Sequence, residues 1–323
     1  MEELYRKRVD VVEMLNSGKL IKICAPMVRY SKLPFRLTVR DYGADICYTP
    51  MIMADSFIHS AIARDLEFQS CAVDTPIVVQ FAAGTEAEFS RAVELVAPYA
   101  DGVDLNCGCP QGWAISEGIG AGLMKNPDLV ANMLKSAKAV AGATPISAKI
   151  RVYEDSRQTV ELARRLEVAG AAYITVHGRT RHQRSSEPVN YEMIRLIQES
   201  VHIPVIANGD IDSLAAAKDV ALRTGVQGVM AARALLENPA LFAGYVCTPW
   251  ECIDRFIRYS MEYGTTGHVL HHHLTKMTGS LLDAADHRLL TTSLSNASVP
   301  TLLEFIDEMR IKYHMNIKDD CTL

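Results

Sequence analysis

The chain has 323 residues, of which 49% are hydrophobic and 22% charged, as is typical of a globular protein with a sizeable core. No run approaches the roughly 18 consecutive apolar residues that a membrane-spanning helix needs, so we expect no membrane partner. The formal net charge of −5 excludes a uniformly basic nucleic-acid-binding surface but leaves room for a local one.

The first twenty residues carry charges throughout and lack the apolar core of a secretory signal. Leu4, Val11, Val12 and Leu15 fall on one side of a helix, so we interpret residues 1–20 as a helical lead-in. We therefore expect a cytoplasmic protein, and a nuclear location is compatible with the same pattern.

Eight short segments with near-continuous apolar character predict buried parallel strands. They are residues 21–25, 44–48, 76–81, 102–106, 145–150, 172–177, 204–207 and 225–230.

Helical patterns alternate with these segments. Thr85 with Glu88 forms a capping box that opens a helix to about residue 98. Asn126 and Asn238 each precede a proline, which predicts an N-cap followed by a proline in the first helical turn. Residues 160–168 have helical spacing and are followed by Gly170.

Eight alternating β and α units predict an α/β fold, a (β/α)8 TIM barrel over residues 21–245. A doubly wound open sheet is the main alternative, but residues 25–36 after the first strand lack its glycine fingerprint. After residue 245 strand patterns stop, and residues 246–323 predict a small all-α domain. Its helices are expected at residues 250–264, 271–286 and 299–315.

Polar side chains follow most of the predicted strands, at the end of a barrel that carries the active site. They include Gln80, Asn106, Lys149, Arg151, His177, Arg179, the segment 208–210 and Arg233. Gln80 and His177 could instead be hydrogen-bonded core residues, and Lys149 a surface lysine. Barrels often bind phosphate after strands seven and eight, where Asn208, Gly209, Asp210 and Arg233 are expected.

Cys107 and Cys109 form the motif C-x-C in DLNCGCPQG. A zinc site needs more ligands and a redox pair usually reads C-x-x-C, so neither is expected, and we predict no metal. Side chains alternate along a strand, so Asn106 faces the pocket and Cys107 packs away from it. Cys109 lies beyond the strand end and is the better chemical candidate. The glycine run at residues 117–124 matches no nucleotide fingerprint, and we expect it to pass closely over a ligand.

Together these motifs resemble the tRNA-dihydrouridine synthases. The resemblance rests on APM at 25–27, SxxPFR at 31–36, QFA at 80–82, DLNCGCP at 104–110, GxGAxLM at 118–124, KIR at 149–151, HGRT at 177–180, NGDI at 208–211 and ARALLENP at 232–239. The VRYSK and CGCPQxWA segments are similar to the eukaryotic branch that acts at D-loop positions 20a and 20b.

The resemblance implies a TIM barrel that binds FMN, which NADPH or NADH reduces transiently. It implies transfer of hydride to C6 of a tRNA uridine and a proton from Cys109 to C5. It implies FMN contacts from Pro26, Met27, Val28, Gln80, Lys149, His177, Asn208, Gly209, Asp210, Ala232 and Arg233, and a uracil-facing amide at Asn106. Ala232 departs from the family pattern, where many members have glycine, and we expect FMN binding to survive.

The expected substrate is the D-loop of tRNA. The barrel mouth should carry its electrostatic footprint through Arg29, Lys32, Arg36, Lys149, Arg151, Arg179, Arg181, Arg184 and Arg233. Among these we predict substrate contacts from Arg151, Arg179 and Arg181. From residue 245 onward the sequence has seven Lys and Arg and ten Asp and Glu. We therefore expect this region to contribute to tRNA binding by its shape and a few placed residues. His271 and His273 are candidate RNA contacts or ordinary surface histidines.

Two alternatives remain open: a small-molecule pyrimidine oxidoreductase on the same FMN barrel, and a tRNA-binding protein without catalysis. The all-α region and the arginine-rich loop at 179–184 argue against the first, and Cys109 with Lys149 argues against the second. The oligomeric state is open, and a monomer is favoured.

Overall fold

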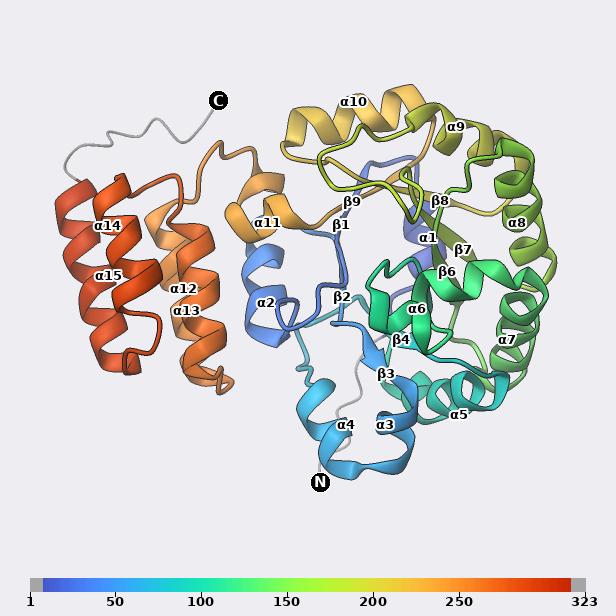
Figure 1. Ribbon diagram of the computed structural model, residues 1–323, viewed down its shortest axis with the longest axis horizontal. Coiled ribbons are helices and arrows are strands. Elements are labelled where there is room, and N and C mark those ends of the chain that lie inside the picture. Colours follow the sequence, from blue (N-terminus) through green and yellow to red (C-terminus); the bar gives the residue numbers. More distant parts are fainter. Residues whose placement is uncertain (1–7, 315–323) are drawn as a thin grey trace.

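The computed structural model describes residues 8–314 and shows a closed barrel of strands beside a bundle of helices (Figure 1). The eight barrel strands are β1 Ile21–Cys24, β2 Ile46–Tyr48, β4 Ile77–Ala82, β5 Gly102–Cys107, β6 Ile146–Arg151, β7 Tyr173–His177, β8 Val205–Asn208 and β9 Gly228–Ala231. All pairings are parallel, and those of β1 with β9 and of β2 with β4 close the ring. The predicted (β/α)8 barrel is confirmed, and the open-sheet alternative is wrong.

A ninth strand was not predicted. β3 Ile52–Met53 adds to β4 beyond β2, with Ile52 in register with Phe81. A two-residue strand is too short to show an alternating or continuous apolar pattern, so the sequence gives no periodic signal for it.

Helices alternate with the strands and cover the outside of the barrel. They are α2 Leu33–Asp41, α3 Ala54–His59, α4 Ala61–Glu67, α5 Glu86–Val96, α6 Gly112–Ser116, α7 Pro127–Val140, α8 Ser156–Val168, α9 Tyr191–Ser200, α10 Leu214–Thr224 and α11 Arg233–Glu237, with short 3-10 turns η1 Ala97–Tyr99, η2 Gly120–Lys125 and η3 Leu241–Ala243.

Two of the predicted caps form as expected. Thr85 Oγ1 accepts from the backbone N–H of Glu88 at 3.2 Å, and the Glu88 carboxylate accepts from Gly84 N at 2.9 Å. Asn126 Oδ1 accepts from Leu129 N at 3.2 Å at the start of α7. The bonds from Glu88 N and Leu129 N each satisfy a backbone donor that the first helical turn leaves unpaired, whereas Gly84 lies just before the N-cap.

The predicted helix start at Asn238 is wrong. Asn238 follows the end of α11, and only the 3-10 turn η3 comes after it. Its Oδ1 accepts from Ala240 N at 3.1 Å, and its Nδ2 donates to the Tyr245 carbonyl at 2.7 Å. The side chain therefore closes a tight turn across residues 238–245 instead of capping an α-helix.

The lead-in contains α1 Val11–Leu15, capped by Asp10. Val11 and Leu15 are buried, as the pattern predicts, while Leu4 lies outside the described residues. A Cβ atom at Gly228 in β9 would lie 2.9 Å from Leu15 Cδ2, so α1 packs tightly against the barrel strands. None of the helices within residues 8–314 is long and apolar enough to cross a bilayer.

The bundle beside the barrel consists of α12 Trp250–Glu262, α13 Gly267–Met277, α14 Ala284–Arg288, a π-helical turn η4 Leu289–Ser293 and α15 Val299–His314 (Figure 1). The prediction of one continuous helix over residues 271–286 is wrong. α13 ends before Gly279, and Asp283 caps the separate helix α14.

The bundle contacts the barrel through α2. Arg255 Nη1 and the Tyr259 hydroxyl, both on α12, lie 3.0 and 2.9 Å from the Asp41 carboxylate. The ring of His273 stacks on Phe35 with centroids 4.8 Å apart, and its Nε2 lies 3.2 Å from the Tyr30 carbonyl oxygen.

His271 and His273 are both buried, with 7% and 1% exposure. His271 Nε2 lies 2.9 Å from the Leu290 carbonyl oxygen, within the bundle. Neither is a surface histidine, and neither can contact RNA in this arrangement. The Nε2 atom of each ring instead lies within hydrogen-bond distance of a backbone carbonyl, inside the bundle for His271 and at its junction with the barrel for His273.

Candidate active site

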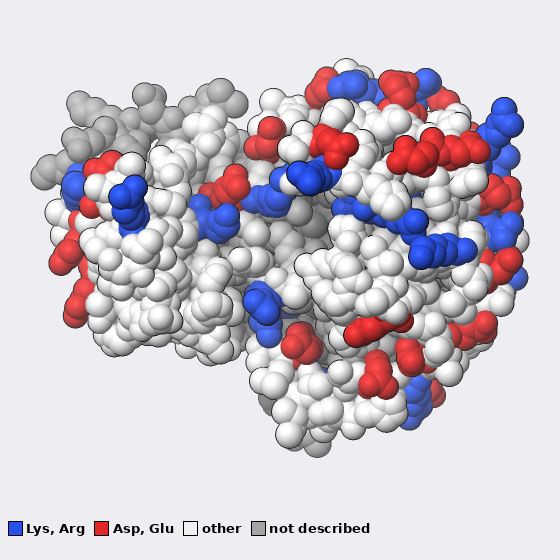
Figure 2. Space-filling view, viewed as in Figure 1, with Lys and Arg blue, Asp and Glu red and all other residues white. Residues whose placement is uncertain are grey.

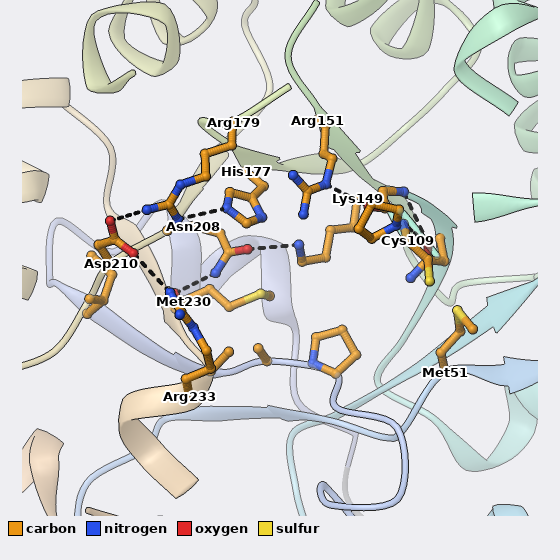
Figure 3. Close-up of a pocket in the computed structure, with 18 of the residues that line it drawn as sticks. Met51, Cys109, Lys149, Arg151, His177, Arg179, Asn208, Asp210, Met230 and Arg233 are labelled. Carbon is orange, nitrogen blue, oxygen red and sulfur yellow. Dashed lines mark hydrogen bonds and ion pairs between the residues drawn. The ribbon is translucent and has the colours of Figure 1, made fainter. Parts of the chain in front are cut away.

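A cavity of about 440 Å³ opens at the carboxyl ends of the barrel strands. Figure 3 shows side chains from the ends of several strands pointing into it from different directions. Parallel strands bring their carboxyl ends to one face of a barrel, so residues distant in sequence meet there.

The two thiols of DLNCGCPQG lie in different environments. Cys107, the last residue of β5, is buried in the hydrophobic core, and burial raises its pKa. Cys109 lies past the strand end and lines the cavity. This confirms the expectation from strand alternation that one thiol packs away from the pocket and the other reaches it.

The loop that carries Cys109 is held from two sides. Asn106 Oδ1 accepts from Gly108 N and Cys109 N at 3.1 and 2.9 Å. On the other side, Ala121 N donates to the Cys109 carbonyl at 2.9 Å. The glycine run at residues 117–124 therefore supports the Cys109 loop, and this contact was not predicted from the sequence.

Lys149 begins a chain of polar contacts across the cavity floor (Figure 3). Its Nζ donates to Asn208 Oδ1 at 2.8 Å, and Asn208 Nδ2 donates to the Met230 carbonyl at 2.9 Å. Burial and the neighbouring Arg151 lower the pKa of Lys149 to about 8. The surface-lysine alternative is wrong, because the ammonium group lies among cavity residues.

Asp210 joins two arginines at the wall of the cavity formed after β7, β8 and β9. Its carboxylate binds Arg179 Nη2 and lies 3.2 Å from Arg233 Nη2. The backbone φ angle is 126° at Gly209 and 47° at Asp210. Both values lie in the left-handed region, which residues other than glycine rarely adopt. A Cβ at Gly209 would lie 2.8 Å from Val189 Cγ2, so this sharp turn needs glycine.

His177 is neutral in this setting. Burial, followed by the charge of Lys149, lowers its pKa to about 2. Its Nε2 lies 3.5 Å from Arg179 Nη1, at the limit of a hydrogen bond. A neutral imidazole has one nitrogen without a proton, and this nitrogen can accept a hydrogen bond from the arginine or from a ligand.

Most of the residues predicted from the sequence meet at this cavity. Those that line it are Pro26, Val28, Gln80, Asn106, Cys109, Lys149, Arg151, His177, Arg179, Asn208, Gly209, Asp210, Ala232 and Arg233. Gln80 is also fully buried and hydrogen-bonded, so its two interpretations are compatible.

Six predicted residues do not line this cavity: Met27, Arg29, Lys32, Arg36, Arg181 and Arg184. Met27 is buried beneath the cavity wall, where its backbone N–H donates to Ser31 Oγ at 3.0 Å. Arg181 lines a neighbouring cavity of about 330 Å³ with Tyr153. Arg36 is 1% exposed and donates to Asp74 at 2.7 Å, so it is a structural ion pair and adds nothing to the charge of the mouth.

Several further lining residues were not predicted as site residues, although most of them lie within the motifs quoted above. They are Ala25, Met51, Gly108, Pro110, Ile211, Asp212, Met230, Ala234 and Glu237. Met51 directly precedes β3, whose short length concealed this part of the mouth. Ile211 and Asp212 follow the predicted phosphate turn directly, and extending that segment by two residues would have included them.

The charged side chains of the cavity favour an anionic ligand. Four cationic side chains (Lys149, Arg151, Arg179 and Arg233) line the cavity with three carboxylates, and Asp210 is already paired with two of the arginines. Arginines bind phosphate through paired N–H groups. No group of three or more metal-ligating His, Cys, Asp or Glu side chains occurs within residues 8–314.

A family model described as dihydrouridine synthase (Dus) matches residues 23–295. The chain belongs to this family. A human protein named tRNA-dihydrouridine(20a/20b) synthase NAD(P)+-like is 47% identical over 91% of this chain and 93% of its own. The Schizosaccharomyces pombe tRNA-dihydrouridine(20a/20b) synthase is 43% identical over 95% of this chain and 93% of its own.

Other dihydrouridine synthases are more distant. A rat protein named tRNA-dihydrouridine(16/17) synthase NAD(P)+-like is 38% identical over 87% of this chain and 64% of its own. A solved 2-naphthoyl-CoA reductase complex shares the fold, with a TM-score of 0.52, 9% identity, and coverage of 69% of this chain and 49% of its own. As a member of the dihydrouridine synthase family, the chain is an oxidoreductase.

Proposed function

We propose that this chain reduces the C5=C6 bond of a D-loop uridine in tRNA, at positions 20a and 20b. The observation that carries the proposal is the placement of Cys109 on the cavity wall, on a loop past β5, with Lys149 among the cavity residues. Relatives named as 20a/20b synthases support the substrate, since two of them share 47% and 43% of aligned residues with this chain.

FMN is the cofactor that we propose for the cavity. When bound, FMN would supply hydride, taken from NADPH or NADH, to C6 of the uracil ring. Arg233 and the turn at Gly209 would hold its phosphate, since that wall offers a guanidinium and close approach to backbone N–H groups. Lys149 would place positive charge beside its polar ring edge.

The remaining chemistry falls to the side chains around the base. Hydride addition at C6 leaves negative charge on the C4 carbonyl oxygen and requires a proton at C5. Cys109 would donate that proton, because a positioned thiol can act as a general acid toward a reacting carbon. Asn106, on the same wall, would hydrogen-bond the base.

The tRNA must present an unstacked base to reach this cavity. Extracting a base costs a few kcal/mol in general, and less where it is already unpaired. Arg151, Arg179 and Arg181 would contact the RNA at the mouth, and the helices of residues 246–323 would add a second contact surface. Placing the charged RNA contacts mainly on the barrel mouth agrees with the low Lys and Arg content of the C-terminal region.

Reconstitution tests the proposal. Purified protein should carry a yellow chromophore that releases FMN on denaturation, and should convert uridine to dihydrouridine in unmodified tRNA with NADPH or NADH. Mass-spectrometric mapping should place the product at 20a and 20b. A colourless protein that cannot take up FMN would favour a non-catalytic RNA-binding role, and reduction of free pyrimidines but not tRNA would favour a small-molecule oxidoreductase.

A further inference from the structure

A buried carboxylate lies directly beneath the proposed base site. Asp104, in β5, is fully buried, and its two oxygens accept hydrogen bonds from different partners. Ser147 Oγ donates to Oδ1 at 2.6 Å, and Gln80 Nε2 donates to Oδ2 at 2.8 Å. None of the chemistry proposed above uses this group.

The carboxylate fixes the orientation of Gln80. An ionised carboxylate can only accept hydrogen bonds, so Gln80 must turn its NH2 group toward Asp104. Its Oε1 then faces Asn106, whose Nδ2 donates to it at 2.8 Å. Gln80 and Asp104 are paired in the register of β4 and β5, and Asn106 lies two residues further along the same face of β5.

The Cys109 loop fixes the other end of this chain. Asn106 Oδ1 accepts from the backbone N–H groups of Gly108 and Cys109, at 3.1 and 2.9 Å. Backbone N–H groups can only donate, so they require the amide oxygen at this position. A reversed Asn106 amide would lose these two bonds and its bond to Gln80 together.

The hydrogen-bonding capacity of Asn106 is therefore almost used up. Both lone pairs of its oxygen and one of its two N–H groups are occupied. One N–H remains, on a residue that lines the cavity. Asn106 can offer a ligand a donor but no acceptor.

We propose that Asp104 is a positioning residue that acts through Gln80, together with the Gly108 and Cys109 N–H groups, to fix the polarity of Asn106, so that the site offers the base a single N–H beside Cys109. The proposal rests on the proposed function, in which Cys109 protonates C5. Of the two ring atoms bonded to C5, only C4 carries a polar group, so the N–H beside Cys109 would meet the substituent at C4.

This polarity would select uracil and assist its reduction. The C4 oxygen of uracil accepts the N–H and gains negative charge during hydride addition, when a positioned donor contributes most. The amino group of cytosine at C4 is itself a donor and would leave both groups unpaired. Sites that hydrogen-bond a substrate group reject analogues that lack it far more strongly than apolar pockets do.

Three variants separate this role from simple core packing. Asp104→Leu removes the acceptor that orients Gln80. Asp104→Asn can retain it, because the amide oxygen accepts from Gln80 while its NH2 donates to Ser147 Oγ. Ser147→Ala is the matched control: it removes the other hydrogen bond of Asp104 and leaves its oxygen toward Gln80 in place.

Two measurements are made on the full chain. The first is the ratio of kcat/KM for tRNA transcripts that carry uridine or cytidine at the target position. The second is the rate at which iodoacetamide alkylates Cys109, followed by peptide mass spectrometry, with buried Cys107 as an internal report of general unfolding.

In Asp104→Leu we expect the uridine preference to fall at least about tenfold, and Cys109 to be alkylated faster while Cys107 stays protected. Asp104→Asn and Ser147→Ala should keep the wild-type preference and alkylation rate. A folded Asp104→Leu protein with unchanged preference and alkylation would overturn the proposal, as would an equal loss in Ser147→Ala.

If Asp104→Leu does not fold, Gln80→Met gives the same test, because methionine keeps the volume of glutamine and removes both hydrogen bonds. Its preference should fall and its Cys109 alkylation should rise, and wild-type values for both would again overturn the proposal. If wild-type protein forms no dihydrouridine in any tRNA, the proposed function fails, while the alkylation rates still decide whether Asp104 orders the Cys109 loop.

Discussion

Lys149 shows how single residues in this cavity are tuned by their neighbours. Its ammonium group binds Asn208 and lies close enough to Arg151 for the like charge to contribute to a pKa of about 8. A lysine whose pKa lies this close to neutral pH responds to the charge of a ligand, because a bound anion stabilises the protonated form and raises the pKa.

We predict that FMN affinity depends on pH through Lys149. A ligand that raises the pKa of a group binds most tightly below the free-protein value, and binding weakens as pH rises through it. In apoprotein, the affinity should be constant below about pH 8 and fall up to tenfold per pH unit above it. Fluorescence titration between pH 7 and 9.5 measures this.

Lys149→Met is the control for this prediction, since it keeps the chain length and cannot titrate. Its affinity for FMN should be weaker at pH 7 and lack the decline above pH 8. An identical decline in the variant would assign the pH dependence to another group.

At this scale the sequence identified residues better than it identified their partners. Strand alternation distinguished Cys109 from Cys107, and position at strand ends found Lys149 and Asn208. It could not reveal that Asp210 binds two arginines, because Arg179, Asp210 and Arg233 come from three different strand ends. Nor could it exclude Arg36 from the mouth, since its partner Asp74 lies 38 residues away.

Among the elements, η2 has the most direct connection to the chemistry. This 3-10 turn packs against the Cys109 loop, and Gly120 has φ 58°. A Cβ atom there would lie 2.9 Å from both the Cβ and the carbonyl oxygen of Cys109. Such a contact forces one of the two segments to move.

We predict that Gly120→Ala lowers the rate of dihydrouridine formation at least about tenfold, because displacing a catalytic group by about 1 Å can cost far more than that. FMN should remain bound, since Gly120 does not line the cavity. Single-turnover rates on tRNA measure the effect.

Gly142→Ala is the matched control. Gly142 has φ 59°, but a Cβ there would meet nothing within 4 Å. It should lose about 1 kcal/mol of stability from backbone strain and keep wild-type activity. Equal activity losses in both variants would show that strain, and not the contact with Cys109, is responsible.

The elements themselves were largely predictable. Strands buried on both faces show continuous apolar runs, so all eight barrel strands were found with small shifts of their ends. Asn238 failed as a predicted helix start because its side chain can close a turn as well as cap a helix. The break in the helix at Gly279 was not predicted, because the helical spacing of apolar residues continues across it.

Over the whole molecule, the barrel mouth and the bundle share one face. Figure 2 shows a hollow with lysine and arginine side chains around it, on a protein whose net charge is −5. Arg29 and Arg184 are exposed, and Arg181 is half-buried, so these cations are available to RNA phosphates. The bundle adjoins the mouth through His273, whose Nε2 lies 3.2 Å from the Tyr30 carbonyl oxygen, after the end of β1.

We predict a steep salt dependence of tRNA affinity. Each phosphate neutralised by a cation contributes a slope of about −0.7 to −0.9 in log K against log salt. Arg181→Ala should reduce the magnitude of the slope by about one contact. Arg195→Ala, which removes a cation already paired with Glu192 and Glu199 on α9, should leave it unchanged. A flat dependence in wild type would contradict an electrostatic footprint at the mouth.

The account as a whole depends on which thiol does the chemistry, and paired variants decide it. In Cys109→Ala, dihydrouridine formation on tRNA should fall by roughly 10²–10⁴-fold, with FMN still bound. In Cys107→Ala it should stay near wild type, with a loss of about 1 kcal/mol in stability from the small cavity left in the core. The reverse result, with Cys107→Ala inactive and Cys109→Ala active, would contradict the site described here.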